Sequence, residues 1–289
     1  MIKESFAALG ASARDLLRNW RGLLILAGLY ALLLASVYYF FATGVANVWQ
    51  LFVTALTAAA APLLFFLLQA GAVNAALPEA TAGRVVRRAP RDLPKVLLLA
   101  VPVALLAALF VYLLWKLPGW LPKVEEPPHV NVVASMSGER PRPLYWQDAL
   151  VSTSWLVLLG FVLPLAAAHL WLSAARTGLK ATLKGLHRVV GRAFAPRSVL
   201  VYAVGLFLFG LMPYFVLFTR TALTSGWAEL TVFGLRLALA FFLTLVGWVV
   251  TLGALARVTP PETGPAVPVS EPEPAEPAPE PVAEPQLQA

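Results

Sequence analysis

The chain has 289 residues, of which 59% are hydrophobic and only 13% are charged, whereas about 25% are charged in an average soluble domain. A soluble protein could not hide that much apolar surface, but a lipid bilayer solvates it. The net charge of +7 does not indicate nucleic-acid binding, because the basic residues follow a membrane pattern described below.

Residues 1–21 predict an amphipathic helix ahead of the first span. Its apolar residues recur at steps of three and four and share one face: Ile2, Phe6, Leu9, Ala13, Leu16 and Trp20. Such a helix can lie in the membrane interface or pack on the cytoplasmic face of the protein. The pattern leaves both arrangements open.

Six apolar runs fill residues 22–257, and each approaches the about 20 residues that cross about 30 Å of hydrocarbon. The runs are continuously apolar and do not alternate, which predicts helices and not β-barrel strands. We therefore predict an all-α, polytopic transmembrane bundle with spans near 22–42, 49–72, 96–115, 149–172, 198–218 and 231–255.

The basic residues predict how the spans are oriented. Sixteen of the 22 Lys and Arg residues fall before the first span or after the second, fourth and sixth, and five fall in the opposite connections. Cytoplasmic connections carry the excess of positive charge. We therefore expect a bacterial inner-membrane protein with both termini in the cytoplasm.

The connection at 173–197 predicts a basic amphipathic helix on the membrane surface, and 73–92 shows a weaker form of the same pattern. Basic side chains beside a membrane attract anionic lipid headgroups. The side chains expected to contact headgroups are Arg84, Arg87, Arg88, Arg176, Lys180, Lys184 and Arg188.

A shift of 102 residues aligns Pro62 with Pro164, Gly83 with Gly185 and Pro94 with Pro196. The alignment suggests two related helical hairpins in the same membrane orientation, although bias toward Leu and Ala could also supply identities. Repeats of this kind occur in transporters, with a binding site between them.

Two segments outside the spans are rich in proline. The outer connection at 116–148 contains six prolines, which exclude a long helix, and allows a short extended element at 130–134. Residues 258–289 include ten prolines and six Glu without a basic residue. That composition predicts a disordered cytoplasmic tail.

Polar residues within the spans are candidates for function. Arg236 lies inside the sixth run, where it can snorkel, pair with Glu229 or Asp148, or contact a substrate anion. Gln69, Asn74 and His169 fall at the inner ends of the second and fourth runs. They could form hydrogen bonds between helices or line a cavity.

The sequence carries no motif that identifies a reaction. It has no Cys, no pair of His at metal-ligand spacing and no glycine-rich phosphate loop. The spans also lack Asp and Glu in their central thirds. We therefore expect no catalytic residues, metal or cofactor, and no enzymatic activity.

The chain resembles bacterial six-helix integral membrane proteins of uncharacterised function. The likeness lies in the lead-in that ends in Leu16, Leu17, Arg18, Asn19 and Trp20, and in the basic connectors around Gly83 and Gly185. Some proteins of this shape form the membrane region of glycerophosphodiester phosphodiesterases. The catalytic domain of those enzymes is missing here, so the resemblance implies the membrane fold and not the activity.

Three functions remain open from the sequence, of which an intramembrane enzyme is the least favoured because the spans lack reactive groups that converge. The first is a non-enzymatic scaffold or accessory subunit that binds lipid headgroups and a protein partner in the membrane. The second is a transporter or lipid-handling protein with a cavity between the two related hairpins. A solid, Leu-packed bundle would favour the first function, and a wide polar cavity at the midplane would favour the second.

Overall fold

The computed structural model describes residues 2–78, 80–121, 146–219 and 225–259 of the chain. Every regular element within these ranges is a helix, and six helical stretches are long and apolar enough to cross a membrane. The stretches are Trp20–Ala42, Val48–Ala76, Ala82–Trp120, Trp146–Thr177, Pro196–Phe218 and Gly226–Val258. The prediction of an all-α bundle with six spans is confirmed, and the chain is a multi-pass membrane protein.

Some spans are built from several helical segments. The elements in chain order are α1 (Ile2–Arg18), α2 (Trp20–Ala42), α3 (Val48–Ala76), α4 (Ala82–Trp120), α5 (Trp146–Trp155), η1 (Leu156–Val162), α6 (Leu163–Thr177), α7 (Leu179–Lys184), α8 (Leu186–Ala193), α9 (Pro196–Leu206), η2 (Phe207–Leu211), α10 (Met212–Phe218) and α11 (Gly226–Val258). The extended element predicted at 130–134 and the tail after Thr259 lie outside the described residues.

Polar side chains mark the starts of the first three membrane helices. Asn19 accepts a hydrogen bond from the Gly22 backbone N–H at 3.3 Å, so the chain turns between α1 and α2. Asn47 and Thr81 accept in the same way at the starts of α3 and α4. A side-chain acceptor at this position satisfies an N–H group that has no partner within the helix.

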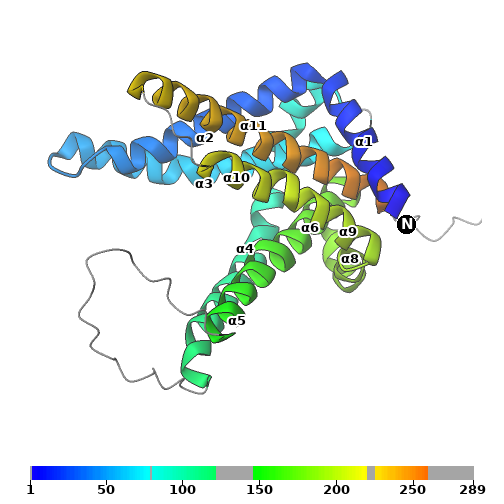
Figure 1. The fold of residues 1–289 in the computed structure, drawn as a ribbon. Coiled ribbons are helices and arrows are strands. Elements are labelled where there is room, and N and C mark those ends of the chain that lie inside the picture. Colours follow the sequence, from blue (N-terminus) through cyan, green and yellow to red (C-terminus); the bar gives the residue numbers. More distant parts are fainter. Residues whose placement is uncertain (1, 79, 122–145, 220–224, 260–289) are drawn as a thin grey trace, which may run out of the picture.

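The helices form two arms that diverge from a common base (Figure 1). Helices α2, α3 and α11 run side by side in one arm, and the far part of α4 runs with α5 in the other. At the base, α4 packs on α3 and α6, and α1 crosses α11. The base therefore joins the two arms and also holds the N-terminal helix.

The buried core lies in this base. All the buried residues of α3 fall between Leu68 and Asn74, and those of α11 fall between Ala240 and Ala256. Farther out, bulky side chains are uncovered: Trp115 is 73% exposed and Trp227 is 81% exposed. Lipid can solvate such side chains, so contacts within the chain stabilise mainly the base.

Glycine allows two elements of the base to approach closely. A Cβ atom added at Gly247 in α11 would lie 2.9 Å from the Cβ of Phe209 and 3.1 Å from its backbone N and Cα. Backbone atoms cannot rotate away from such a contact. Gly247 therefore sets the distance between α11 and η2, as small residues do where membrane helices pack tightly.

Helix α1 packs on the bundle through one face, as one of the two predicted arrangements requires, and leaves a second face exposed. The residues buried against the bundle are Ser5, Leu9, Ser12 and Leu16. Ser12 fixes the crossing, because its hydroxyl donates to the backbone oxygen of Val250 in α11 at 2.9 Å. Beside this face, Ile2, Phe6, Leu17 and Trp20 are exposed. This outer stripe suits the membrane interface.

The predicted hairpins correspond at their first helix ends and differ after them. Helices α3 and α6 end within one residue of equivalent positions, because Ala76 aligns with Gly178 and α6 ends at Thr177. After that point, the basic residues of the first unit belong to α4, whose 39 residues extend for about 58 Å. In the second unit, Gly185 separates two short helices, α7 and α8, and Pro196 begins α9. The separate surface helix predicted around 73–92 is therefore wrong.

Candidate functional site

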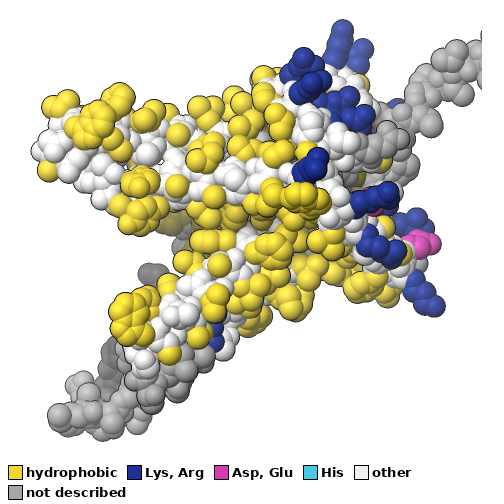
Figure 2. Space-filling view, turned by 90° about the horizontal axis from the view of Figure 1, so that it is seen from above, with side chains coloured by type: hydrophobic (Ala, Val, Ile, Leu, Met, Phe, Trp, Pro, Cys, Tyr) yellow, Lys and Arg dark blue, Asp and Glu magenta, His cyan; other side chains and the backbone are white. Residues whose placement is uncertain are grey.

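Basic side chains gather at the base, away from the tips of the arms (Figure 2). Arg87 and Arg88 are exposed on the first turns of α4. Lys180 and Lys184 on α7 and Arg188 on α8 are exposed as well. An uncovered apolar stripe lies on the same two short helices: Leu183, Leu186 and Val190. This combination of basic and apolar side chains is typical of a helix in the membrane interface.

Arg176 differs from the other predicted headgroup contacts because its side chain points into the protein. Its guanidinium donates to the backbone oxygen of Thr259 at 2.7 Å and also to that of Ala256. Both acceptors lie at the C-terminal end of α11, where backbone oxygens have no partner within the helix. Arg176 therefore caps α11, and its positive charge complements the helix dipole.

Arg236 has a similar role in the arm that contains α11. It donates to the backbone oxygen of Thr219, the residue that ends α10. Glu229 and Asp148 are exposed in the first turns of α11 and α5, and no ion pair joins either of them to Arg236 within the described ranges. The guanidinium is thus used as a helix cap.

The polar residues Gln69, Asn74 and His169 lie in three separate contacts and not in one cluster. The Gln69 side-chain oxygen accepts from the Trp248 indole N–H at 2.7 Å, which joins α3 to α11. His169 contacts the Leu165 backbone oxygen at 3.0 Å and the Ser198 hydroxyl at 3.3 Å, which joins α6 to α9. Both side chains are buried, so these bonds hold helices together.

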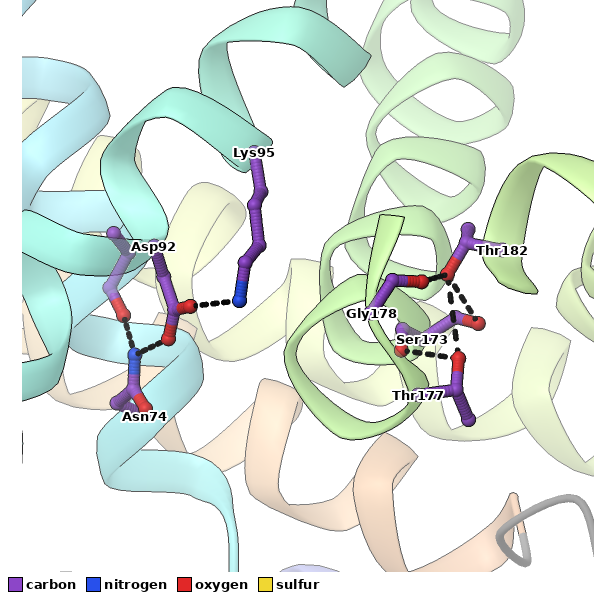
Figure 3. A network of polar contacts seen from close by, with 8 residues as sticks. Asn74, Asp92, Lys95, Ser173, Thr177, Gly178 and Thr182 are labelled. Atoms are coloured by element: carbon purple, nitrogen blue, oxygen red, sulfur yellow. Dashed lines mark hydrogen bonds and ion pairs between the residues drawn. The ribbon is translucent and has the colours of Figure 1, made fainter. Parts of the chain in front are cut away.

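Asn74 belongs to a network that sequence reasoning missed (Figure 3). Its amide donates to a carboxylate oxygen of Asp92 at 3.0 Å, and the other oxygen lies 2.6 Å from the Lys95 ammonium. Asn74 and Asp92 are both buried. Asp92 is the only acidic residue between Arg84 and Lys95. This isolated acidic residue in a basic stretch was the feature of the sequence that could have indicated the network.

A second polar network lies at the turn from α6 to α7 (Figure 3). The Thr182 hydroxyl donates to the Gly178 backbone oxygen at 3.0 Å and lies 3.1 Å from the Ser173 hydroxyl. Gly178 has a φ of 86°, a conformation that glycine adopts without steric cost. The network fixes the direction in which α7 leaves the bundle.

One pocket at the base is large enough for a small ligand. It encloses about 760 Å³ between the α1–α2 corner, the turn from α3 to α4 and the end of α11, within the range of about 300–1,000 Å³ that is usual for ligand sites. Three arginines line it: Arg18, Arg21 and Arg257. Gln69, Asn74 and His169 do not line it, and it does not lie between the two predicted hairpins.

The lining of this pocket combines apolar and polar residues. Its apolar lining includes Leu16, Leu77 and Val249, and its polar lining includes Ser12, Asp15, Asn19 and Thr81. A second hollow begins beside it and is lined by Thr81, Gly83, Arg84, Arg87, Arg88 and Arg91. The two hollows share Thr81 and Gly83, so a basic surface continues outward from the pocket.

The part of the chain described here contains no group of three or more His, Asp or Glu residues able to hold a metal ion. No family model, curated protein or solved structure matches the chain in comparisons with known proteins. The resemblance to six-helix bacterial membrane proteins thus stays a prediction.

Proposed function

We propose that the protein is a non-enzymatic scaffold or accessory subunit of the inner membrane. The observation that carries this proposal is that the polar side chains at the base form contacts between helices. Gln69, Asn74 and His169 each join one helix to another, and Arg176 caps a helix end. Groups that hold the structure in this way are not free to act on a substrate.

The basic end faces the cytoplasm in this proposal, and both termini lie there. Its support is the gathering of Lys and Arg at the base (Figure 2), because cytoplasmic ends of spans carry the excess of positive charge. Reporters test it directly. A reporter that works only in the periplasm should be active when fused after residue 130 and inactive when fused after residue 258. The reverse result would refute the orientation.

The partner in this proposal is a transmembrane helix of another protein, which packs against the outer half of α4. Beyond Ala100, Leu114 is the one buried residue of α4, and large side chains are uncovered, among them Leu105, Tyr112 and Trp115. The two arms diverge there, and both present hydrophobic side chains to the space between them (Figure 2). A membrane helix would cover these side chains by close packing.

Copurification after extraction in a mild detergent tests the partner. We expect one membrane protein in constant stoichiometry with the wild type, and its loss from the double variant Tyr112→Ala/Trp115→Ala at the tip of α4. The matched control is Trp49→Ala/Phe52→Ala, which removes two exposed rings, stacked 5.7 Å apart, from the tip of α3. Retention by both variants, or equal loss from both, would contradict a partner site on α4.

A second candidate function is the handling of lipids, and the pocket beside Arg18 and Arg21 favours it. Its apolar and basic lining residues suit a molecule with a charged head and an apolar body. If the purified protein carries bound lipid and no stoichiometric protein, that result would favour this function over the scaffold.

A further inference from the structure

We propose that the pocket between the α1–α2 corner, the α3–α4 turn and the end of α11 binds the phosphate-bearing headgroup of an anionic phospholipid. The inference does not depend on the scaffold, because it concerns the base and not the arms. The pocket lies where α2 and α4 begin and α11 ends. These helix ends mark the depth at which headgroups lie in a bilayer.

The charges of the pocket favour an anion. Arg18 ends α1 and Arg21 begins the first span, so the turn at Asn19 brings both to the same pocket. Arg257 reaches it from α11 and forms an ion pair with Asp15, the only acidic side chain among the described lining residues. Within the described residues no ion pair joins Arg18 or Arg21 to an acidic side chain. The Arg21 guanidinium lies over the ring of Trp20 at 5.6 Å from its centroid, a contact that uses the face of the guanidinium and not its N–H groups, so both arginines can donate to a ligand. Guanidinium groups bind phosphate through two parallel hydrogen bonds.

The start of α4 adds backbone donors to the same pocket. The Thr81 hydroxyl accepts from the Arg84 N–H at 3.3 Å, and the N–H groups of Ala82 and Gly83 have no partner within the helix. The positive end of the helix dipole lies here as well. Gly83 leaves open space where a Cβ atom would be. A phosphate can thus come close to the backbone at this point.

The apolar wall selects a lipid over a soluble phosphate ester. Leu16, Leu77 and Val249 line the pocket together with the arginines, and they suit the glycerol backbone and the first methylene groups of acyl chains. Trp20 also lines it and stands at the start of the first span. Tryptophan is common at this depth because its ring is apolar and its N–H group is polar.

Native mass spectrometry of the full chain in a mild detergent tests the proposal. The probes are short-chain phosphatidylglycerol, phosphatidylcholine with the same chains, and the deacylated headgroup glycerophosphoglycerol. We compare Arg18→Gln/Arg21→Gln with the matched control Lys180→Gln/Lys184→Gln, which removes two charges from the same basic end outside the pocket. A third variant, Gly83→Phe, fills the pocket and keeps every charge. Thermal unfolding in the same detergent verifies that each variant is folded.

Phosphatidylglycerol should bind the wild type more tightly than phosphatidylcholine does. Arg18→Gln/Arg21→Gln should weaken its binding about 25-fold, since one arginine beside an anionic lipid contributes about fivefold. The control should lose about twofold or less, and Gly83→Phe should bind weakly although its charges are intact.

Three results would overturn the proposal. Equal losses from the arginine variant and the lysine control would mean that general surface charge attracts the lipid. Unchanged binding to folded Gly83→Phe would mean that the pocket is not the site. Glycerophosphoglycerol binding as tightly as phosphatidylglycerol would mean that a soluble phosphate ester, and not a lipid, is the ligand.

Discussion

Replacement of Gly247 by Ala should destabilise the base, because α11 and η2 touch there through backbone atoms. The new Cβ would lie 2.9–3.1 Å from Phe209 Cβ, Cα and N, which is too close for carbon atoms in contact. The two elements would have to separate, and added methyl groups in a packed core cost about 1–3 kcal/mol. Alanine also favours the helix by about 0.5–1 kcal/mol relative to glycine, which offsets part of this loss.

A second glycine of the same helix, Gly234, separates the steric cost of the new methyl group from the gain in helix preference. A Cβ atom at Gly234 meets nothing within 4 Å, so Gly234→Ala should gain only the helix preference. Unfolding in mixed micelles with increasing denaturing detergent measures the free energy of unfolding of both variants. Gly247→Ala should be less stable than Gly234→Ala by about 1–3 kcal/mol. If the two variants have equal stability, α11 and η2 are not in the close contact described above.

Three further substitutions test side chains at the base and at the outer end. Arg176→Gln should lower the free energy of unfolding by about 1–2 kcal/mol, because α11 loses a charged cap. The control Lys180→Gln should change it by less than about 0.5 kcal/mol. Equal effects of the two substitutions would argue against the cap. Asp92→Ala should cost about 1–3 kcal/mol because the buried Asn74 amide loses an acceptor, and Asp92→Asn, which keeps an acceptor oxygen, should cost less. Arg236→Leu should leave membrane insertion intact, as assayed by carbonate extraction, and a failure to insert would contradict its role as a local cap.

Hydropathy predicted the six spans because it depends on local composition. The predicted span at 198–218 corresponds to the helical stretch Pro196–Phe218, and that at 22–42 to Trp20–Ala42. The start of the third helix was not predicted, since α4 continues through Pro90 and Pro94. Basic residues and prolines indicated the end of the hydrocarbon region, but they do not show whether the helix itself ends there.

The contacts of the polar side chains could not be predicted, because their partners are far away in the sequence. Arg176 was expected among the headgroup contacts, but its acceptors belong to the end of α11. Arg236 lies within the sixth span, and its acceptor at Thr219 comes from the preceding helix. The backbone oxygens that lack a partner at a helix end cannot be recognised from the residue types in the sequence.

The pocket at the base was also beyond sequence reasoning. Its walls come from α1, α2, the α3–α4 turn and α11, which lie together only after the bundle has formed. The apolar periodicity of residues 2–20 was correctly recognised. It did not show that Leu9 and Leu16 pack on the bundle while Ile2 and Phe6 stay exposed.

The π-helical segments determine where the chain tolerates a change of length. In η1, the Leu163 N–H bonds to the Leu158 oxygen five residues back, so the turn holds one residue more than an α-helix needs. Deletion of Leu159 would restore the α-helical bond and leave the residues of α6 facing the same neighbours. Deletion of one residue inside α6 would instead rotate the rest of that helix by about 100° and turn His169 or Arg176 away from its acceptors. Insertions and deletions of one residue should therefore accumulate in η1 and η2 as the sequence diverges, and should be rare in α6 and α11.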